Sequence, residues 1–484
     1  LTATDVDERD PKLSPDGRHV SFRKEHDLYL MEIANRKVTR LTHDGSETLL
    51  NAEVDWLYPE ELDLGTAHWW SPDSSWIAYL QFDISREPVF PQVDLLSTPA
   101  RYEPQRYPKA GQPNPDVRLG IVSPGGGTTR WFDLGDTRGA LLARVHWSPA
   151  GKSIAVQRMN RIQNQLDLSL VDIDSGKSRV LLQETDPHWV NLADDFRFLE
   201  DGERFLWSSE RDGFRHLYLY SIDGKVIRRL TRGEWQVTEV IEVDEESDRV
   251  FYLSTESSPL ERQLYSVTLE GKRKERISEA SGTHAISMSP AANFYVDTFS
   301  SLKMPPRKTL HKTDGSKVAV FQEPDKRLTE ELEILPAEIV EVKTSDGVTL
   351  YGRMIKPANF DPAKEYPVVV MIYGGPHSQM VRNAWPCVCW EQVLAQRGFL
   401  IWQLDNRGTS FRGLKFETPV FRNLGEQELK DQKEGIEYLE AAGFADTSRM
   451  GIYGWSYGGY MTLYSLMNAP ELFKAGIAGA PVVD

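Results

Sequence analysis

A turn of the type Ser-Pro-Asp recurs along the first two thirds of the chain, and a β-rich segment follows it or a close variant each time. The segments are short, carry many β-branched and aromatic residues, and show no long helical period. A second β-rich segment usually comes next, and the units are spaced by about 45 to 77 residues. Six units are recognisable, and they begin near residues 14, 70, 147, 198, 243 and 289.

These repeats predict a β-propeller over residues 1–330, because short strands separated by turns at this spacing are typical of propeller blades. A β-sandwich also consists of short strands, but it does not explain why the same turn recurs. Residues 331–484 differ, since strand-like and helix-like segments alternate there, and this pattern predicts an α/β domain with a parallel sheet. We therefore expect two domains with a linker zone at residues 331–336.

The second domain has a clear expected order of elements. Two strands around Ser345-Asp346-Gly347 favour a hairpin, and the continuous apolar run at residues 366–373 suits a buried strand. The expected strands are 339–342, 349–355, 366–373, 400–405, 450–453 and 475–480, and the expected helices are 427–442 and 459–467.

Composition excludes several classes of partner. The chain has 484 residues, of which 40% are hydrophobic and 26% charged, and its net charge is −16. This charge argues against nucleic acid and anionic membrane surfaces as partners. No run of 18 apolar residues occurs, so we expect no membrane span. The sequence starts at Leu1 without a methionine, so we expect that a leader was removed or that the sequence begins inside the gene product.

Cysteines and histidines give no sign of a metal site or other cofactor. Cys387 and Cys389 are two residues apart, which is poorly suited to an ordinary disulfide bridge, and no histidines cluster with them. We expect two buried thiols. The histidines of the first domain are scattered without ligand spacing and are expected to be structural: His19, His26, His43, His68, His146, His188, His216, His284 and His311.

The stretch around Ser456 has the pattern of a nucleophile elbow. Gly454-x-Ser456-x-Gly458 lies between the predicted strand 450–453 and the predicted helix 459–467. In such an elbow the serine hydroxyl stands out above the sheet, and flanking glycines let the backbone pass where a Cβ would clash. The alternative is an ordinary helix-opening turn in which the Ser456 side chain caps the helix.

The longer string from Gly454 to Gly459 resembles the nucleophile motif of the prolyl oligopeptidase family of serine peptidases, and Trp455 resembles its dipeptidyl peptidase IV branch. The resemblance implies a β-propeller, usually eight-bladed, followed by an α/β-hydrolase domain. It also implies that the hydroxyl of Tyr373 and the backbone amide of Tyr457 form the oxyanion hole. His377 is not expected to be the base, because in this fold the base follows the nucleophile in the chain.

A second motif lies at Glu60 and Glu61. By themselves two adjacent carboxylates indicate a solvated loop or helical turn. Their setting, Asp-Trp-x-Tyr-x-Glu-Glu from Asp55 onward, resembles the segment of dipeptidyl peptidase IV whose two glutamates bind the α-ammonium of the substrate. Pro59 departs from the acidic residue expected at its place. Residues 107–115 and 209–217 resemble the same branch and are expected to be propeller structure.

The catalytic triad cannot be completed from this sequence. The family order is Ser, then Asp, then His, yet no histidine follows Ser456 and the one aspartate after it is Asp484. Of the pocket for the second substrate residue, Val482 and the Tyr457 ring are expected to be present. We expect that both ends are missing, including two blades and the arginine that the family places before Leu1.

The resemblance implies a serine exopeptidase that releases Xaa-Pro or Xaa-Ala dipeptides from peptides with free N-termini, through an acyl-enzyme on Ser456. A tripeptidyl or acylaminoacyl peptidase on the same scaffold, and a non-catalytic propeller binding module, are the alternatives. The resemblance allows a homodimer. It also leads us to expect a periplasmic or secreted location, as does the absence of any glycosylation sequon, while a cytoplasmic one stays open.

Overall fold

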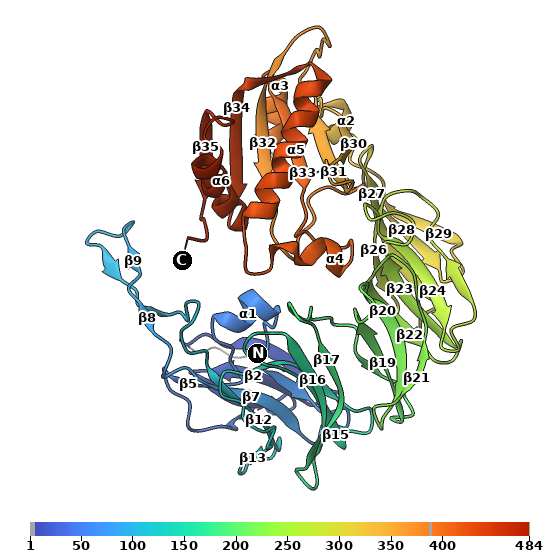
Figure 1. Ribbon diagram of the computed structural model, residues 1–484. Helices are drawn as coiled ribbons and strands as arrows, with labels where there is room; N and C mark the ends of the chain where they lie inside the picture. The colour runs from blue at the N-terminus through green and yellow to red at the C-terminus, as the bar shows by residue number, and fades with distance from the viewer. Residues whose placement is uncertain (1–4, 387–389, 484) are drawn as a thin grey trace.

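The computed structural model describes residues 5–386 and 390–483. Its first part is a series of antiparallel sheets that succeed one another in chain order (Figure 1). Each of the six blade-like sheets in the described residues has four or five strands. They comprise β1 (Arg9–Leu13) to β4 (Val38–Arg40); β5 (Leu49–Asn51), β6 (His68–Trp70), β7 (Ile77–Asp83), β12 (Asp116–Val122) and β13 (Arg130–Trp131); β14 (Leu141–Trp147) to β17 (Ser178–Thr185); β18 (Arg197–Phe198) to β21 (Val226–Arg229); β22 (Val237–Asp244) to β25 (Lys274–Arg276); and β26 (Thr283–Met288) to β29 (Lys317–Gln322).

The inner strands of these sheets have the following bounds. They are β2 (His19–Lys24), β3 (Asp27–Glu32), β15 (Ser153–Met159), β16 (Gln165–Asp172), β19 (Arg204–Ser209), β20 (His216–Ser221), β23 (Arg249–Ser254), β24 (Gln263–Thr268), β27 (Phe294–Ser301) and β28 (Met304–Lys312). Most of them are largely buried, and large aliphatic and aromatic side chains from neighbouring sheets form a shared apolar core.

The recurring Ser-Pro-Asp turn joins the first two strands of a blade by a defined set of hydrogen bonds. Ser14 Oγ donates to Asp16 Oδ1 at 2.6 Å and accepts the backbone N–H of His19 at 3.0 Å. Ser71 repeats both contacts, at 2.6 and 3.0 Å, with the residues two and five positions further on. The fourth residue has positive φ, 71° at Gly17 and 61° at Ser74. The motif therefore recurs because its side chain closes the turn.

A narrow arm projects from the second blade and was not foreseen from the sequence. It consists of β8 (Val89–Phe90), β9 (Val93–Asp94), β10 (Arg101–Tyr102) and β11 (Gln105–Arg106), which form two short ladders. Leu95 and Leu96 at its tip are 79% and 98% exposed. Figure 1 shows the arm reaching away from the blades at the left.

The second part is built on one six-stranded sheet in the order β30-β31-β33-β32-β34-β35. Its strands are β30 (Ala337–Lys343), β31 (Thr349–Ile355), β32 (Tyr366–Ile372), β33 (Leu400–Asp405), β34 (Ala445–Trp455) and β35 (Ala475–Gly479). The expectation of a parallel sheet is wrong for one edge. The β30–β31 hairpin joins β33 in an antiparallel sense, whereas β33, β32, β34 and β35 run parallel.

Helices cover this sheet and connect its strands. They are α3 (Trp390–Gln396), α4 (Leu414–Glu417), the 3-10 turn η1 (Thr418–Val420), α5 (Glu426–Ala442) and α6 (Tyr457–Asn468), while α2 (Arg327–Glu330) lies just before the linker and α1 (Leu57–Leu62) in the second blade. Leu439 of α5 and Met461 of α6 are fully buried in a core of their own, separate from that of the blades. Two cores indicate two folding units.

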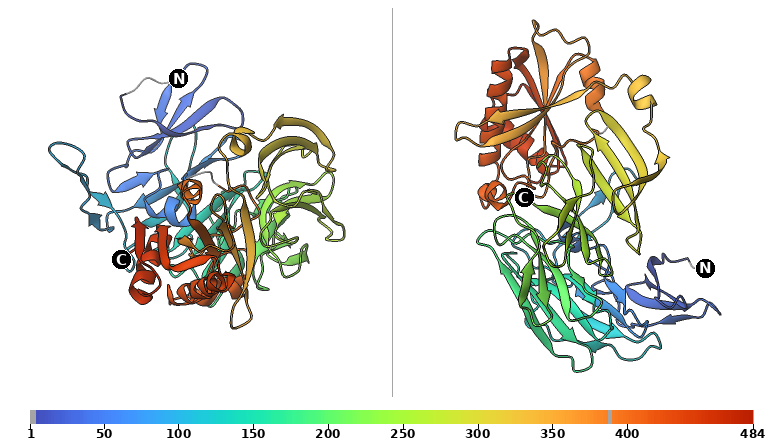
Figure 2. Two further views of the ribbon diagram at one scale, coloured as in Figure 1. Left: turned by 90° about the horizontal axis from the view of Figure 1, so that it is seen from above. Right: turned by 90° about the vertical axis from the view of Figure 1, so that its right-hand side faces the viewer.

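The two parts meet through hydrogen bonds between loops. Arg262 Nη2 donates to Gln379 Oε1 at 2.6 Å, the backbone N–H of Asn383 to the Leu260 carbonyl at 2.8 Å, and the N–H of Gly413 to Gln236 Oε1 at 2.9 Å. Figure 1 and the right-hand view of Figure 2 show the α/β part above the blades, and Figure 1 shows α1 on the side of the blades that faces it.

Candidate active site

Ser456 stands at a strained turn between β34 and α6. Its φ and ψ are 56° and −118°, outside the regions that a non-glycine residue ordinarily occupies. A Cβ on Gly454 would lie 2.1 Å from the Gly458 carbonyl oxygen, and one on Gly458 would lie 2.2 Å from that of Ile372. The glycines are thus required by the close approach of β34, α6 and β32, as the motif predicts.

The Ser456 hydroxyl is not used to cap the helix that follows it. Ser456 occupies the N-cap position of α6, but its side chain makes no capping hydrogen bond. The helix-cap alternative is therefore wrong. Its backbone N–H donates to the Gly479 carbonyl at 2.9 Å and its carbonyl accepts from Tyr460 at 3.0 Å, which fixes the turn through the main chain alone.

Tyr373 and Tyr457 lie next to each other beside the turn. Tyr373 directly follows β32, and the centroids of the two rings are 6.1 Å apart. A Cβ on Gly375 would lie 2.7 Å from the Tyr457 ring, so this glycine lets the rings approach. Burial, and secondly the carboxylate of Glu60 from the blades, raise the pKa of Tyr373. The phenol therefore stays protonated and can donate a hydrogen bond.

The hydroxyl of Tyr457 has a partner that sequence reasoning missed. It donates to Oε1 of Glu428 in α5 at 2.6 Å, and Oε2 of Glu428 accepts the N–H of Gly425 at 2.9 Å. Burial and the bond to Glu428 raise the pKa of Tyr457. Since the hydroxyl is engaged, the ring and the backbone amide are what Tyr457 can offer to a ligand.

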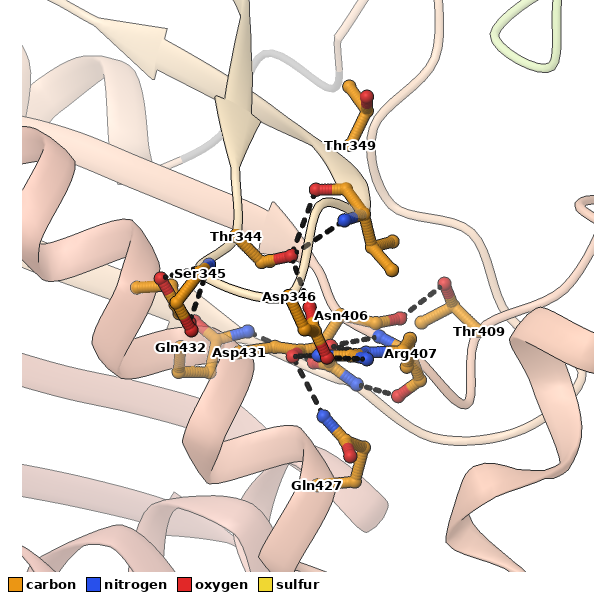
Figure 3. A network of polar contacts seen from close by, with 12 residues as sticks. Thr344, Ser345, Asp346, Thr349, Asn406, Arg407, Thr409, Gln427, Asp431 and Gln432 are labelled. Carbon is orange, nitrogen blue, oxygen red and sulfur yellow. Dashed lines mark hydrogen bonds and ion pairs between the residues drawn. The ribbon is translucent and has the colours of Figure 1, made fainter.

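A buried polar network positions the loop after Tyr373 (Figure 3). Asn406 Nδ2 donates to the Gly374 carbonyl at 2.9 Å, and Gln432 of α5 donates to Asn406 Oδ1 at 3.0 Å. Arg407 bonds Asp431 at 2.6 Å and Asp346 at 2.7 Å. The network connects the end of β32 to α5 and to the β30–β31 turn. It therefore fixes the backbone of Gly374, the residue that follows Tyr373.

Glu60 and Glu61 lie on the short helix α1, and both are exposed. The helix is anchored by three contacts. Tyr58 is fully buried and its hydroxyl accepts the N–H of Leu142 at 3.0 Å, Arg144 Nη1 donates to the Leu62 carbonyl at 2.7 Å, and Asp55 Oδ1 accepts the N–H of Tyr58 at 3.1 Å. Partial loss of hydration at the Glu61 carboxyl, and then the charge of Glu60, raise the pKa of Glu61.

A cavity of about 370 Å³ lies between the two parts and is lined by Glu60 and Glu61 from the blades. The α/β part contributes His377, Ser410, Phe411 and Glu417 to its wall. His377 Nε2 lies 2.8 Å from Asn191 Oδ1, and burial, then Arg215, lower the pKa of this histidine. Ser456 and Tyr373 are not among the residues that line this cavity.

A Ser-His-Asp contact in the first two blades offers no site for a substrate. His68 Nε2 lies 3.0 Å from Ser21 Oγ and its Nδ1 lies 3.3 Å from Asp10 Oδ2. Ser21 and His68 are fully buried, and Trp70 Nε1 already donates to Ser21 Oγ at 2.9 Å. His216 is likewise structural, since Thr231 and the Gly233 carbonyl engage both ring nitrogens at 3.0 and 2.9 Å.

Two family models match the sequence. The model of the N-terminal region of dipeptidyl peptidase IV matches residues 1–306, and the model of the prolyl oligopeptidase family matches residues 388–484. The chain belongs to the prolyl oligopeptidase family, in its dipeptidyl peptidase IV branch. The predicted combination of a propeller with an α/β-hydrolase domain is confirmed.

Solved structures of this family resemble the whole described fold. The dipeptidyl peptidase 4 of Porphyromonas gingivalis is 32% identical, with a TM-score of 0.93 over 99% of this chain and 68% of its own. A putative dipeptidyl aminopeptidase IV from Bacteroides ovatus is 29% identical, with a TM-score of 0.90 over 99% of this chain and 70% of its own.

Among curated relatives, a probable dipeptidyl-aminopeptidase B of Emericella nidulans is 32% identical over 97% of this chain and 56% of its own length. A probable dipeptidyl peptidase 4 of Aspergillus flavus is 30% identical over 97% of this chain and 64% of its own length. The chain thus spans a little over half the length of these family members.

The remaining predicted site residues lie near the end of the described chain or outside the described residues. Val482 follows β35 and is 52% exposed. Cys387, Cys389 and Asp484 lie outside the described residues. Within residues 5–386 and 390–483, no helix is long and apolar enough to cross a membrane, and no three His, Cys, Asp or Glu side chains gather as metal ligands.

Proposed function

We propose that the protein is a serine dipeptidyl peptidase, which releases Xaa-Pro or Xaa-Ala dipeptides from peptides with a free N-terminus. The observation that carries this proposal is the strained turn at Ser456, where φ is 56°, ψ is −118° and the side chain caps no backbone group, beside the paired rings of Tyr373 and Tyr457. Glu60 and Glu61 of the blades line the cavity between the two parts, and the Glu60 charge also contributes to raising the Tyr373 pKa. Two carboxylates that bind the substrate's ammonium at a fixed distance from Ser456 would determine how many residues lie between the N-terminus and the bond that is cleaved.

The proposed mechanism follows from the geometry of the elbow. Ser456 Oγ attacks the carbonyl of the second substrate residue, and the Tyr373 hydroxyl and the Tyr457 N–H stabilise the oxyanion. The peptide bond after the second residue breaks, and the remainder of the peptide leaves with a protonated amine while the dipeptide stays as an ester on Ser456. Water then hydrolyses this ester, which releases the dipeptide and restores the Ser456 hydroxyl. Among the described residues no histidine is in hydrogen-bond contact with Ser456 Oγ, so the elbow supplies the nucleophile and the oxyanion donors.

Glu60 and Glu61 are proposed to hold the substrate's ammonium. An α-amino group titrates near 7.7–8.0 and is largely cationic at neutral pH. Charge-assisted hydrogen bonds to two carboxylates are strong and directional. In this proposal the ammonium lies at α1 and the scissile carbonyl at Ser456. The separation of these two sites sets the length of the product, which the proposal takes to be two residues.

Product length tests this function. The protein, purified as its natural source makes it, is incubated with a peptide that begins Gly-Pro-Gly, and the products are analysed by mass spectrometry. Release of Gly-Pro that is absent in Ser456→Ala supports the proposal. Release of a tripeptide, or of an acetylated residue from a blocked peptide, would assign the scaffold to the corresponding peptidase. No product and no labelling of Ser456 by a fluorophosphonate would favour a binding module.

Location and assembly are proposals as well. A periplasmic or secreted location is proposed from the family resemblance and the absence of sequons, and cell fractionation tests it. A homodimer would explain the exposed leucines of the arm, Leu95 and Leu96. Sedimentation of the protein with both leucines changed to serine tests that assembly.

A further inference from the structure

Two carboxyl groups meet in the interior at the start of α1. Asp55 and Glu87 are 8% and 3% exposed. The two carboxyl groups interact with each other, and Asp55 Oδ2 and both Glu87 oxygens are buried without any hydrogen-bond donor among the described residues. A hydrogen bond between two carboxyl groups requires a proton on one of them. This pair therefore contains one proton.

The pair serves the helix that presents Glu60 and Glu61. The other oxygen of Asp55, Oδ1, accepts the N–H of Tyr58 in the first turn of α1 at 3.1 Å. Asp55 thus interacts with the Glu87 carboxyl group and, through Oδ1, with the first turn of the helix. Removal of the Glu87 proton would place two negative charges side by side in the interior. The Asp55 carboxylate would then be repelled by Glu87, and its contact with the Tyr58 N–H would be disturbed.

Glu87 is itself fixed at the base of the arm. Arg106 of β11 donates to the Glu87 carbonyl at 2.7 Å, and Tyr107 donates its N–H to the Pro88 carbonyl at 3.0 Å. The Tyr107 ring packs on Trp56, the residue before α1, with centroids 4.3 Å apart. The base of the arm and the start of α1 therefore form one packed unit.

We propose that protonated Glu87 is a positioning residue for the ammonium site, which holds α1 and its Glu60–Glu61 pair in place through Asp55. This inference rests on the proposed function. Loss of the Glu87 proton is expected to loosen the first turn of α1 and to weaken the binding of the substrate's amine. The chemical step at Ser456 is not expected to change, because the elbow has no contact with the pair.

The groups that face Glu87 support this assignment. Burial first, and then the Asp55 charge and the bond to Asp55, raise the pKa of Glu87 to about 8, while Arg106 opposes the change. Burial also raises the pKa of Asp55, although the backbone N–H groups of Leu57 and Tyr58 act to lower it. Arg86, the neighbour of Glu87, pairs with Asp116 at 3.4 Å. The proton therefore resides on Glu87 at neutral pH.

The test compares KM and kcat of the full-length protein and of Glu87→Gln for a Gly-Pro anilide between pH 6.5 and 9.5. Glutamine keeps a donor at every pH, so it mimics the protonated form. The amine of the substrate titrates identically for both proteins, and its effect cancels in the ratio of the two KM values. Glu103→Gln, an exposed position on the arm, is the matched control.

We expect the ratio of wild-type to Gln KM to be near one at pH 6.5, and to rise by up to tenfold for each pH unit above the Glu87 pKa of about 8. The kcat values should agree throughout. A ratio that stays flat, or a change confined to kcat, overturns the inference. If no dipeptide is released by the wild type at any pH, the proposed function fails instead.

Asp55→Asn provides a second test should Glu87→Gln not fold. Asparagine keeps an oxygen for the Tyr58 N–H and offers an amide N–H to ionised Glu87, so the pair no longer needs a proton. Its KM is expected to lack the additional alkaline rise seen in the wild type. A rise equal to that of the wild type contradicts the role of the shared proton.

Discussion

The hydroxyl of Tyr457 donates to Oε1 of Glu428 across 2.6 Å, and this bond ties the first residue of α6 to the first turn of α5. Glu428 is fully buried, so its oxygen has no alternative donor from solvent. The nucleophile turn is thus braced by a helix that lies about thirty residues earlier in the chain. The bond explains how a strained turn is kept in one conformation.

Tyr457→Phe should therefore destabilise the protein by about 1–3 kcal/mol, because it leaves a buried carboxylate oxygen unpaired. Tyr464→Phe is the control, since the Tyr464 hydroxyl makes no hydrogen bond among the described residues. Urea unfolding gives both free energies. Equal stability of the two variants would show that the bond to Glu428 contributes nothing.

Gly458→Ala should disrupt the elbow. The new Cβ would lie 2.2 Å from the Ile372 carbonyl oxygen, which is backbone and cannot move aside cheaply. Overpacking of this kind costs roughly 1–3 kcal/mol or more, and labelling of Ser456 by a fluorophosphonate should be lost. Gly65→Ala is the matched control, because nothing lies within 4 Å of its Cβ position. Labelling at the wild-type rate in Gly458→Ala would contradict the tight packing described.

Tyr373→Phe should lower kcat by about 10²–10³, the usual effect of removing one oxyanion donor. Because the phenol only donates in the transition state, KM should change little. Steady-state kinetics with a Gly-Pro anilide measures both quantities. A loss carried mainly by KM would assign Tyr373 to substrate binding.

The contact between the domains should depend on pH through Glu417. Burial first, and then the nearby Glu210, raise the pKa of Glu417 from 4.5 to about 7. A pKa raised on folding means that this contribution to stability is fully present below about 4.5 and is lost as the pH rises through about 7. The Tm of Glu417→Gln should therefore rise relative to that of the wild type as the pH increases from 5 to 8.

Thermal unfolding of Glu417→Gln, the wild type and the exposed control Glu437→Gln across this range checks the prediction. Glu417 accepts from Ser410 at 3.0 Å and Asn191 at 3.3 Å, so the glutamine variant keeps most of its contacts. If the difference in Tm between Glu417→Gln and the wild type did not change with pH, Glu417 would be ionised throughout.

Local motifs carried most of what could be predicted from the sequence. The elbow at Ser456 is specified by glycines within four residues of it, and the blade turns are closed by a serine and the residues that follow it. The predicted strands 366–373 and 400–405 agree with β32 (Tyr366–Ile372) to within one residue and with β33 (Leu400–Asp405) in full. These features depend on neighbours in the chain, which a sequence displays directly.

The remaining features depend on contacts between distant segments. Glu428 reaches Tyr457 from α5, Asn406 reaches Gly374 from the end of β33, and Glu87, which follows β7, interacts with Asp55 before α1. No spacing rule predicts such pairs. The antiparallel attachment of the β30–β31 hairpin to β33 was missed for the same reason, since alternating elements do not reveal which sheet edge a hairpin joins.

The most direct test of the central claim measures kcat/KM of Glu60→Gln and Glu61→Gln on a Gly-Pro anilide with a free amine and on its N-acetylated form. The account predicts a loss of at least tenfold for the free amine, since a charge-assisted contact is removed, and little change in any residual activity on the acetylated form. An equal loss on both substrates would contradict the role of the two glutamates as the site that binds the ammonium.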